Sequence, residues 1–349
     1  MSRTDFYPLR VATVDPLTDD AAAVTFDVPP DLRDVFAFAP GQSLTVRHGA
    51  ERRSYSICAA AGRPPRIGVR EVAGGAVSGW LVRTVRAGDT VEVQAPAGSF
   101  TPDLTRPGRH VLIAAGSGIT PMLSIAASVL AANDESTVTL LYGNRRSDSV
   151  MFADEVADLK DAHPTRMRLV HVLSREPQEV ELFSGRLDAA KLRTLLPATV
   201  DPAGVDRWWL CGPYGMVTDA IEVLTELGVD RGRIHRELFY VEEAPPEEVH
   251  HVDAPPGPGA EVNLVLDGRR STVTVPYDTP VLDAAQRVRP DLPFACKGGV
   301  CGTCRARLTG GEVRMRRNYA LDPDELAAGY VLTCQALPVT DRLDIDYDA

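Results

Sequence analysis

The sequence predicts a multidomain chain made of an antiparallel β-barrel, a doubly wound parallel α/β domain and a small α+β domain, in that order. Three observations predict this organisation. Short alternating apolar runs fill the first hundred residues, strands and helices alternate in the middle, and four cysteines gather near the C-terminus. With 349 residues, the chain is long enough for two or three domains that each have a core.

The barrel is predicted over residues 1–105. Alternating runs separated by Pro and Gly lie at 22–26, 43–47, 66–70 and 90–93. Two polar clusters interrupt them, at 52–56 and 74–81. The first cluster can be interpreted as a polar strand end, and the second as a surface turn into a helix. Arginine, hydroxyl groups and a helix N-terminus also suit a flavin and its phosphates.

The α/β domain is predicted over residues 106–241. Strands are expected at 111–115, 137–142, 168–173, 208–211 and 234–239, with helices at 122–132, 149–160, 189–196 and 214–227. Such alternation predicts a parallel sheet with its ligands at the carboxyl ends of the strands.

A glycine turn follows the first of these strands. Gly116 and Gly118 stand where a pyrophosphate would meet a helix N-terminus, although a G-x-G turn can also be only a tight connection. The turn is not the G-x-G-x-x-G fingerprint, because Pro121 occupies the final position.

Four cysteines give the most specific signal. They follow the pattern C-x4-C-x2-C and then a distant fourth Cys, which is the ligand spacing of a plant-type [2Fe–2S] cluster: Cys296, Cys301, Cys304 and Cys334. Small residues between them allow the loop to close tightly round a cluster. Zinc is the alternative, but structural zinc sites usually pair two short C-x2-C or H-x3–5-H units.

A helix is marked before the fourth cysteine. Asp322 suits the N-cap, Pro323 the first turn, Glu325 a capping box and Gly329 the C-terminal end. We expect this helix to return Cys334 to the loop.

Charge and composition limit the function. The net charge of −11 argues against nucleic acid as a partner, and no apolar run approaches the 18 residues of a membrane span. Disulfides would require export, whereas the first five residues are polar and no apolar segment follows, so a cytoplasmic protein is expected. Residues 242–260 carry five acidic residues, five prolines and no Lys or Arg, which predicts a stiff acidic linker before the cluster domain at 261–349.

Together, these segments resemble the ferredoxin-NADP reductase superfamily with a C-terminal plant-type ferredoxin domain of β-grasp fold. The resemblance implies that Arg53 pairs with a flavin phosphate, that Tyr55 packs on the flavin ring and that Ser56 hydrogen-bonds near its N5 atom. The family's pyrophosphate motif falls on Gly75-Ala76-Val77-Ser78.

The nicotinamide motif of the superfamily resembles the run that includes Gly116, Gly118, Thr120 and Pro121. Cys211 and Gly212 match the stretch that brings a cysteine beside the nicotinamide, although a buried strand cysteine is the alternative. The end-strand region near the flavin is matched by Glu237 and Phe239. Ser56, Cys211 and Glu237 are the expected catalytic residues, and Cys58 is assigned to the core.

The nucleotide is expected to be NADPH, with NADH as the alternative. A 2′-phosphate favours arginine, which the sequence offers at Arg145 and Arg146 after one strand and at Ser174-Arg175 after the next. Surface arginines are common in a chain of this composition, so the assignment of NADPH depends on whether these arginines lie close together in the folded protein.

The resemblance implies that electrons pass from NADPH through FAD and the cluster to an oxygenase. FMN remains an alternative to FAD. The similarity of residues 296–304, 318–321 and 329–335 points to a di-iron phenylacetyl-CoA epoxidase of phenylacetate catabolism as the acceptor. A Rieske-type ring or steroid hydroxylase is the alternative acceptor. A non-catalytic ferredoxin-like carrier is the alternative from another class.

Overall fold

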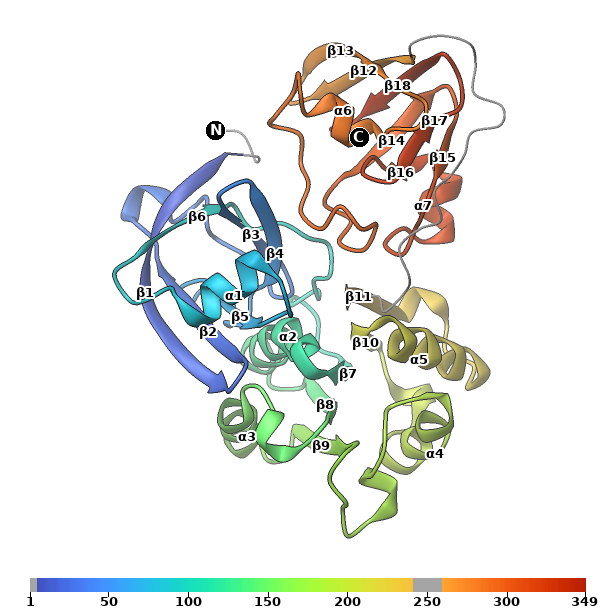
Figure 1. Cartoon of the computed structure of the whole chain (residues 1–349). Coiled ribbons are helices and arrows are strands. Elements are labelled where there is room, and N and C mark those ends of the chain that lie inside the picture. The colour runs from blue at the N-terminus through green and yellow to red at the C-terminus, as the bar shows by residue number, and fades with distance from the viewer. Residues whose placement is uncertain (1–4, 241–258) are drawn as a thin grey trace. The chain divides into compact units, whose positions relative to one another are not determined.

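The computed structural model describes residues 5–240 and 259–349 (Figure 1). Residues 6–240 form one compact unit, and the second unit consists of residues 259–349 together with Asp5. Apart from residues 259 and 260, the predicted linker lies outside the described residues. The boundary predicted between residues 105 and 106 lies inside the first unit and stays a prediction.

The first part of unit 6–240 is a six-stranded antiparallel sheet in the order β4-β3-β6-β1-β2-β5. Its strands are β1 (Phe6–Thr18), β2 (Ala21–Asp27), β3 (Ser43–His48), β4 (Glu51–Ser56), β5 (Arg66–Arg70) and β6 (Thr90–Gln94). The two edges approach each other after β4, where Ile57 bridges Ile67 and the Cys58 N–H donates to the Arg66 carbonyl at 2.8 Å. The sheet therefore curls into the predicted barrel, and helix α1 (Ala76–Arg83) follows β5.

Strand β1 was missing from the sequence prediction. It contains Pro8 and Pro16, and its pairing with β2 shifts register at two places. These irregularities interrupt the alternation by which strands are recognised. The cluster at 52–56, one interpretation of which was a strand end, forms most of β4.

The second part of unit 6–240 is a five-stranded sheet whose adjacent strands are all parallel, in the order β11-β10-β7-β8-β9. Its strands are β7 (Arg109–Ala115), β8 (Thr137–Asn144), β9 (Met167–Leu173), β10 (Arg207–Pro213) and β11 (Ile234–Tyr240). The helices are α2 (Ile119–Ala132), α3 (Ala153–Ala162), α4 (Ala189–Thr199) and α5 (Tyr214–Glu226), with α2 and α3 on one side of the sheet and α4 and α5 on the other (Figure 1). The strand order reverses between β7 and β10, which is where ligands bind in doubly wound sheets.

Two helix starts differ from the prediction. Helix α2 begins at Ile119, directly after the glycine turn, and not at residue 122. Helix α3 begins at residue 153 because Phe152, its N-cap, has a φ of 57° that cannot continue a helix.

Unit 259–349 has the predicted α+β character. A mixed five-stranded sheet runs in the order β13-β12-β18-β14-β16, and β15 pairs with β17 beside it. The strands are β12 (Ala260–Leu266), β13 (Arg269–Val275), β14 (Arg305–Gly310), β15 (Val313–Met315), β16 (Tyr330–Leu332), β17 (Ala336–Pro338) and β18 (Arg342–Asp346). Helices α6 (Val281–Ala285) and α7 (Pro323–Ala327) complete the unit. The capping box expected at Asp322 and Glu325 is present at the start of α7.

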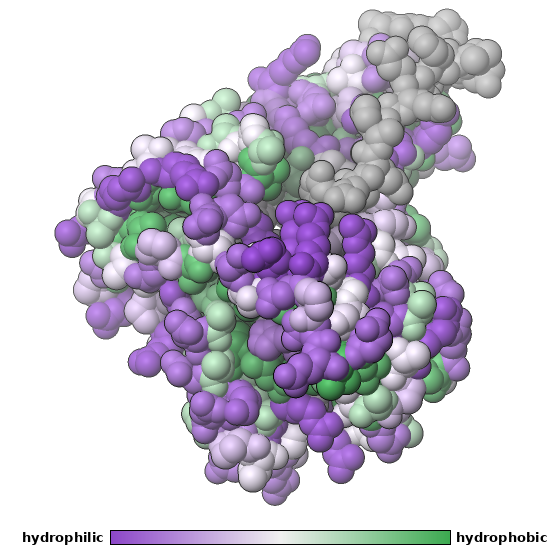
Figure 2. Space-filling view, turned by 60° about the horizontal axis from the view of Figure 1, so that its bottom comes forward, coloured by the Kyte–Doolittle hydropathy of each residue, from purple (hydrophilic) through white to green (hydrophobic). Residues whose placement is uncertain are grey.

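Short 3₁₀ turns connect several elements: η1 (Pro30–Leu32), η2 (Gly116–Gly118), η3 (Ser147–Ser149), η4 (Glu181–Phe183), η5 (Pro202–Gly204) and η6 (Arg231–Arg233). Among the described residues, no helix is both long enough and apolar enough to cross a membrane. Figure 2 shows a face on which hydrophilic residues predominate. Among the residues that the structure describes, the large apolar side chains that remain exposed are scattered along the sequence: Val72, Val180, Leu227, Val288, Leu326 and Val339.

Candidate redox site

The glycine turn lies at the point where the strand order reverses. Gly116, at the end of β7, has a φ of 54°, in the left-handed region that favours glycine. Gly118 approaches β10 so closely that a Cβ atom there would lie 2.1 Å from the carbonyl oxygen of Cys211. Both glycines are therefore required by the backbone path, and the turn opens directly into α2.

The other residues of this motif shape the turn. Thr120 is buried and donates its hydroxyl to the Ser117 carbonyl at 3.0 Å, and Pro121 lies in the first turn of α2. No side chain caps this helix N-terminus. Its N–H groups therefore lie at the place where a dinucleotide phosphate would bind.

Cys211 is fully buried in β10, next to Gly212. Burial, together with the nearby Glu237 carboxyl, raises the pKa of the Cys211 thiol well above its ordinary value, so the thiol stays neutral. Its side chain belongs to the hydrophobic core, as the alternative interpretation of this cysteine had it. A place for Cys211 against the nicotinamide stays a prediction.

Ser56 and Glu237 meet although 181 residues separate them in the sequence. The Ser56 hydroxyl, at the end of β4, donates to the Glu237 carboxylate in β11 at 2.9 Å. Burial raises the pKa of Glu237 to about 7, and the hydrogen bond from Ser56 opposes part of this rise. Part of the Glu237 surface remains accessible, yet its carboxyl lies deep in the protein. A carboxyl with this pKa can take up or release a proton near neutral pH.

Glu237 also joins the two halves of the unit. It pairs with Cys211 across β10 and β11, while Phe239, two residues further along β11, packs against the core that contains Cys211. The three predicted catalytic residues thus come from β4, β10 and β11 to one place.

Tyr55 and Arg53 lie two residues apart on β4 and therefore on the same face. Tyr55 packs against the barrel core, and burial raises its pKa, so the phenol stays neutral. Arg53 pairs with Glu51 at 2.8 Å, with about half of each side chain exposed (47% and 50%). Such a surface pair contributes only about 0–1 kcal/mol, so a phosphate can take the place of Glu51.

The turn before α1 contains the predicted pyrophosphate motif. The Ser78 hydroxyl donates to the Gly75 carbonyl at 3.3 Å and accepts the Val72 N–H at 3.1 Å. Val77 is buried in the barrel core. No side chain caps this helix either, so Gly75, Val77 and Ser78 shape a helix N-terminus that is able to receive an anion.

The two predicted locations for the 2′-phosphate lie next to each other. Beyond β8 and β9, the Ser174 N–H donates to the Asn144 carbonyl at 2.9 Å and the Arg175 N–H to the Arg145 carbonyl at 2.8 Å. Arg145 and Arg175 are therefore neighbours. Neither guanidinium makes a hydrogen bond or ion pair with another described residue.

Arg146 is not available to a phosphate at this location, and Glu176 adds a negative charge to it. The Arg146 guanidinium pairs with Asp148 at 3.1 Å and is therefore already engaged. Glu176 accepts two hydrogen bonds from Ser147, at 2.8 and 2.9 Å, which lower the pKa of its carboxyl. A phosphate here would therefore meet the guanidinium groups of Arg145 and Arg175 and one fixed carboxylate.

The four cysteines form two pairs. The Cys301 side chain hydrogen-bonds to Cys296 and lowers the pKa of Cys296 to about 5, and Cys304 hydrogen-bonds to Cys334 and lowers its pKa likewise. Within residues 5–240 and 259–349, no three Cys, His, Asp or Glu side chains converge on a single ion. Two thiol pairs suit two irons, each with two cysteine ligands.

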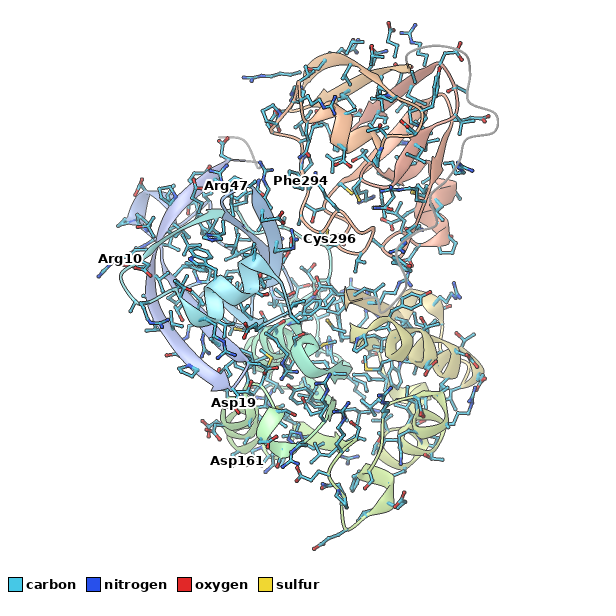
Figure 3. The ribbon with its side chains drawn as sticks, in the orientation of Figure 1. Arg10, Asp19, Arg47, Asp161, Phe294 and Cys296 are labelled. Atoms are coloured by element: carbon cyan, nitrogen blue, oxygen red, sulfur yellow. The ribbon has the colours of Figure 1, made fainter. Side chains whose placement is uncertain are left out.

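The loop between the first two cysteines supplies N–H donors. The Cys296 sulfur accepts from the Gly298 and Cys301 N–H groups at 3.3 and 3.4 Å. Lys297, Gly299 and Gly302 take positive φ values of 52, 78 and 68°, which turn the backbone round the loop. Figure 3 labels Cys296 at the start of this loop and Phe294 two residues before it. The donors and the paired thiols fit a [2Fe–2S] cluster.

The second cysteine pair is held by a buried polar chain. The Thr333 hydroxyl donates to the Cys304 carbonyl at 3.0 Å, and the Tyr347 hydroxyl donates to Thr333 at 2.9 Å. Cys304 and Cys334 are both buried. These contacts fix the strand ends that carry the second pair.

Two residues that support the site, Tyr142 and Gln335, were missing from the sequence prediction. The Tyr142 hydroxyl, in β8, donates to the Gly116 carbonyl at 3.1 Å and steadies the glycine turn. Gln335 donates to the Cys334 sulfur at 3.5 Å. The Tyr142 contact could not be predicted from the sequence, because Tyr142 and Gly116 lie far apart along the chain. By contrast, the position of Gln335 directly after Cys334 can be seen in the sequence.

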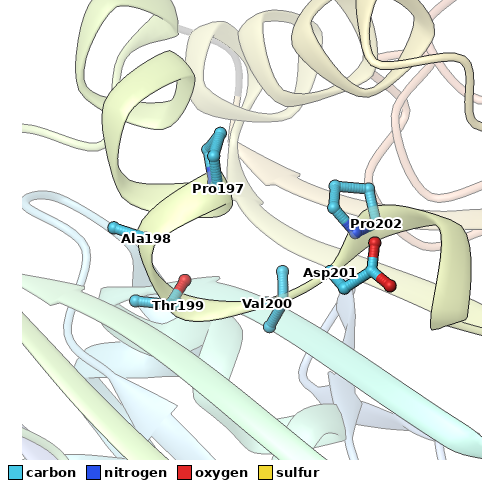
Figure 4. Close-up of a pocket in the computed structure, with 6 residues that line it drawn as sticks. All are labelled: Pro197, Ala198, Thr199, Val200, Asp201 and Pro202. Carbon is cyan, nitrogen blue, oxygen red and sulfur yellow. The ribbon is translucent and has the colours of Figure 1, made fainter.

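A surface hollow lies elsewhere, between α4 and β10 (Figure 4). It is lined by six consecutive residues, 197–202, none of which is a predicted site residue. Its single carboxylate, Asp201, accepts the Ala203 N–H and caps η5. This hollow is therefore a feature of the loop and has no part in the redox site.

Two family models match the chain. Residues 112–222 match the oxidoreductase NAD-binding domain and residues 264–339 the 2Fe-2S iron-sulfur cluster binding domain. The first match lies within the part that contains the parallel sheet and ends before β11, and the second lies within the unit that carries the cysteines and ends before β18.

Similar proteins extend over the whole chain. One of the subunits of the 1,2-phenylacetyl-CoA epoxidase of Escherichia coli (strain K12) is 44% identical, with 99% of each chain covered. The ferredoxin reductase component of the 3-ketosteroid-9-alpha-monooxygenase of Rhodococcus rhodochrous is 35% identical, with 97% of this chain and 96% of that protein covered.

Among solved structures, phthalate dioxygenase reductase shares the fold, with a TM-score of 0.63 at 23% identity over 99% of this chain and 100% of that one. The parallel sheet, the paired cysteines and the full-length similarity agree. The chain therefore belongs to the ferredoxin-NADP reductase superfamily, among the reductase components of oxygenases that carry a C-terminal [2Fe–2S] domain.

Proposed function

We propose that this chain draws electrons from NADPH and delivers them singly to a di-iron phenylacetyl-CoA epoxidase in phenylacetate catabolism. The observation that carries the choice of acceptor is the 44% identity to a component of the Escherichia coli epoxidase over 99% of both chains. As a member of its superfamily, the chain is an NAD(P)H-dependent oxidoreductase with a flavin and a [2Fe–2S] cluster. When bound, the flavin accepts an electron pair from the nicotinamide, and the cluster accepts one electron at a time.

The chain's own residues orient the reaction. The flavin, proposed to be FAD, would lie against Tyr55, with its phosphates at Arg53 and at the N-terminus of α1. The nucleotide would cross the glycine turn between β7 and β10. The Ser56 hydroxyl, which donates to the Glu237 carboxylate at 2.9 Å, and the Glu237 carboxyl would lie beside the flavin ring near N5, where Glu237 could hold or release a proton. The buried Cys211 would shape the floor of the nicotinamide site.

NADPH is the proposed donor because Arg145 and Arg175 are neighbours in the backbone and their guanidinium groups make no hydrogen bond or ion pair with the described residues. Two guanidinium groups can bind the 2′-phosphate that distinguishes NADPH from NADH. We place the protein in the cytoplasm, where NADPH is available and the cysteines stay reduced.

The test is anaerobic stopped-flow reduction with NADPH or NADH, followed by addition of the oxygenase. We expect flavin bleaching, then cluster bleaching, then cluster reoxidation by the epoxidase. A flavin that bleaches while the cluster stays oxidised would contradict the electron relay. No NAD(P)H-driven dye reduction in flavin-loaded protein would favour a non-catalytic carrier.

A steroid or ring hydroxylase is the second candidate acceptor. It is favoured by the 35% identity to the 3-ketosteroid-9-alpha-monooxygenase reductase component. Reoxidation of the reduced cluster by such a hydroxylase, and not by the epoxidase, would decide for it.

Cys301→Ser separates the cluster from the flavin. Removing one of four thiolates prevents correct cluster assembly, while the other unit keeps its residues. We expect NADPH-driven dye reduction to stay within about twofold and electron delivery to the oxygenase to disappear. Delivery that survives in this variant would mean that electrons leave by another route.

A further inference from the structure

Gln335 directly follows the fourth cysteine and is almost completely buried, with 2% of its surface exposed. Its amide nitrogen lies 2.8 Å from the Lys297 carbonyl oxygen and 3.5 Å from the Cys334 sulfur. One side chain thus reaches both the loop of the first cysteine pair and a ligand of the second.

The orientation of this amide is fixed by its partners. Lys297 offers a carbonyl oxygen and Cys334 a sulfur, and both are acceptors. Only the NH₂ end of the amide can bond to both, because the reversed amide would set one carbonyl oxygen against another.

The amide oxygen shows what this arrangement costs. Gln335 Oε1 is buried and has no hydrogen-bond partner among the described residues. An unsatisfied buried acceptor costs about 1–3 kcal/mol, which an apolar side chain of the same shape would avoid. A glutamine here is therefore explained by its two N–H donors and not by packing.

The Gln335 side chain holds Lys297 in place. Its φ of 52° is unfavourable for a residue with a side chain. Its ammonium group is held by Asp283 and Gln286 at 2.8 and 2.9 Å, while Gln335 holds its carbonyl. The stem of Gln335 also lies under Gly299, where an added Cβ would be 3.1 Å from Gln335 Cγ.

We propose that Gln335 is a positioning residue for the [2Fe–2S] cluster, which joins the two halves of the cysteine loop and raises the cluster's reduction potential through its hydrogen bond to Cys334. A reduced cluster carries one more negative charge, so a donor to a ligand sulfur stabilises it more than the oxidised cluster. Backbone N–H groups donate to the Cys296 sulfur in this way, and the Gln335 side chain donates to the Cys334 sulfur. The inference rests on the cluster and is independent of which oxygenase receives the electrons.

The test is the midpoint potential of the cluster in the full-length protein, followed by electron paramagnetic resonance during redox titration. Gln335→Met keeps the length of the side chain and removes the donor. We expect the electron equilibrium to shift about tenfold away from the cluster, which is about 59 mV for a one-electron couple. Gln335→Glu, which lacks the donor and adds a negative charge, should shift it further in the same direction.

Gln286→Met is the matched control, because Gln286 contacts only the Lys297 ammonium in this loop and no sulfur. We expect its midpoint potential to equal that of the wild type. A Gln335→Met protein with full cluster content and an unchanged potential would overturn the proposal.

A second measurement uses the wild-type protein, so it does not require Gln335→Met to assemble its cluster. In wild-type protein with ¹⁵N in the glutamine side-chain amides, pulsed resonance of the reduced cluster should show a ¹⁵N coupling, and the coupling should persist in Gln286→Met. Absence of this coupling in the wild type would overturn the hydrogen bond to Cys334.

Discussion

At the scale of single residues, Glu237 combines a buried position with a proton that it holds near neutral pH. Its pKa of about 7 lies above its ordinary value of 4.5. Because the folded protein binds this proton more tightly than the unfolded chain, its contribution to folding is complete below the unfolded pKa. It is lost as the pH rises through the folded pKa, with a total of up to about 3 kcal/mol.

We therefore expect Glu237→Gln to gain stability over the wild type as the pH is raised from about 5 to about 8, because glutamine has no proton to lose. The measurement is the melting temperature of the full-length protein at several pH values. Curves for wild type and variant that stay parallel over this range would show that the pKa of Glu237 is ordinary.

Gly118 offers a second residue-scale prediction. A Cβ at this position would lie 2.1 Å from the Cys211 carbonyl, and both atoms belong to backbone segments that cannot turn away. We expect Gly118→Ala to raise the KM for NADPH at least tenfold and to destabilise the unit by more than about 2 kcal/mol.

Gly215→Ala is its control, since a Cβ there meets nothing within 4 Å and Gly215 lies inside α5. It should leave the KM unchanged and stabilise the helix by up to about 1 kcal/mol. Equal KM values for Gly118→Ala and Gly215→Ala would contradict the close approach of the turn to β10.

At the scale of elements, the adjacent ends of β8 and β9 bring together two arginines that lie 30 residues apart in the sequence. Parallel pairing continues past both strands through the Asn144–Ser174 and Arg145–Arg175 backbone hydrogen bonds. The sequence offered two separate arginine positions, and it could not tell that adjacent strands bring them together.

We expect Arg175→Ala to lower kcat/KM for NADPH by roughly tenfold to a hundredfold, with little change for NADH, because a bidentate contact to the 2′-phosphate is lost. Steady-state dye reduction with both nucleotides measures this ratio. Arg146→Ala, which removes an arginine already paired with Asp148, is the matched control and should change neither value. A parallel loss with NADH would show that Arg175 does not select the phosphate.

At the scale of the whole molecule, the chain joins a flavin- and nucleotide-binding unit to a cluster-binding unit. The acidic, proline-bearing stretch at 242–260 lies between them in the sequence. Its part in function stays a prediction from composition: a tether that lets the cluster meet its donor and its acceptor in turn.

Deleting about half of residues 243–260 should slow cluster reduction while flavin reduction by NADPH keeps its rate, since only the second step needs the tether. Stopped-flow absorbance separates the two steps. A Gly/Ser segment of the original length is the control for length against composition. Unchanged cluster reduction in the shortened protein would contradict a tether that limits the rate.

Local signals account for most of what could be predicted. The cysteine spacing, the α7 capping box and the strand–helix alternation are properties of neighbouring residues, and the structure contains all three. Strand β1 was missed because its prolines and register shifts interrupt the local pattern. The interpretation of Cys211 was left open because burial, unlike spacing, is not encoded locally.

The sequence alone predicted the domain types and their order, the four cysteines proposed to hold the cluster and the glycine turn, since each depends on residue type at short separation. Only the tertiary structure decided that Ser56 donates a hydrogen bond to Glu237, that Arg145 lies beside Arg175 and that Gln335 reaches both Lys297 and Cys334. These contacts join segments up to 181 residues apart, and their energies depend on burial and on strand order. Neither burial nor strand order exists before the sheets have assembled.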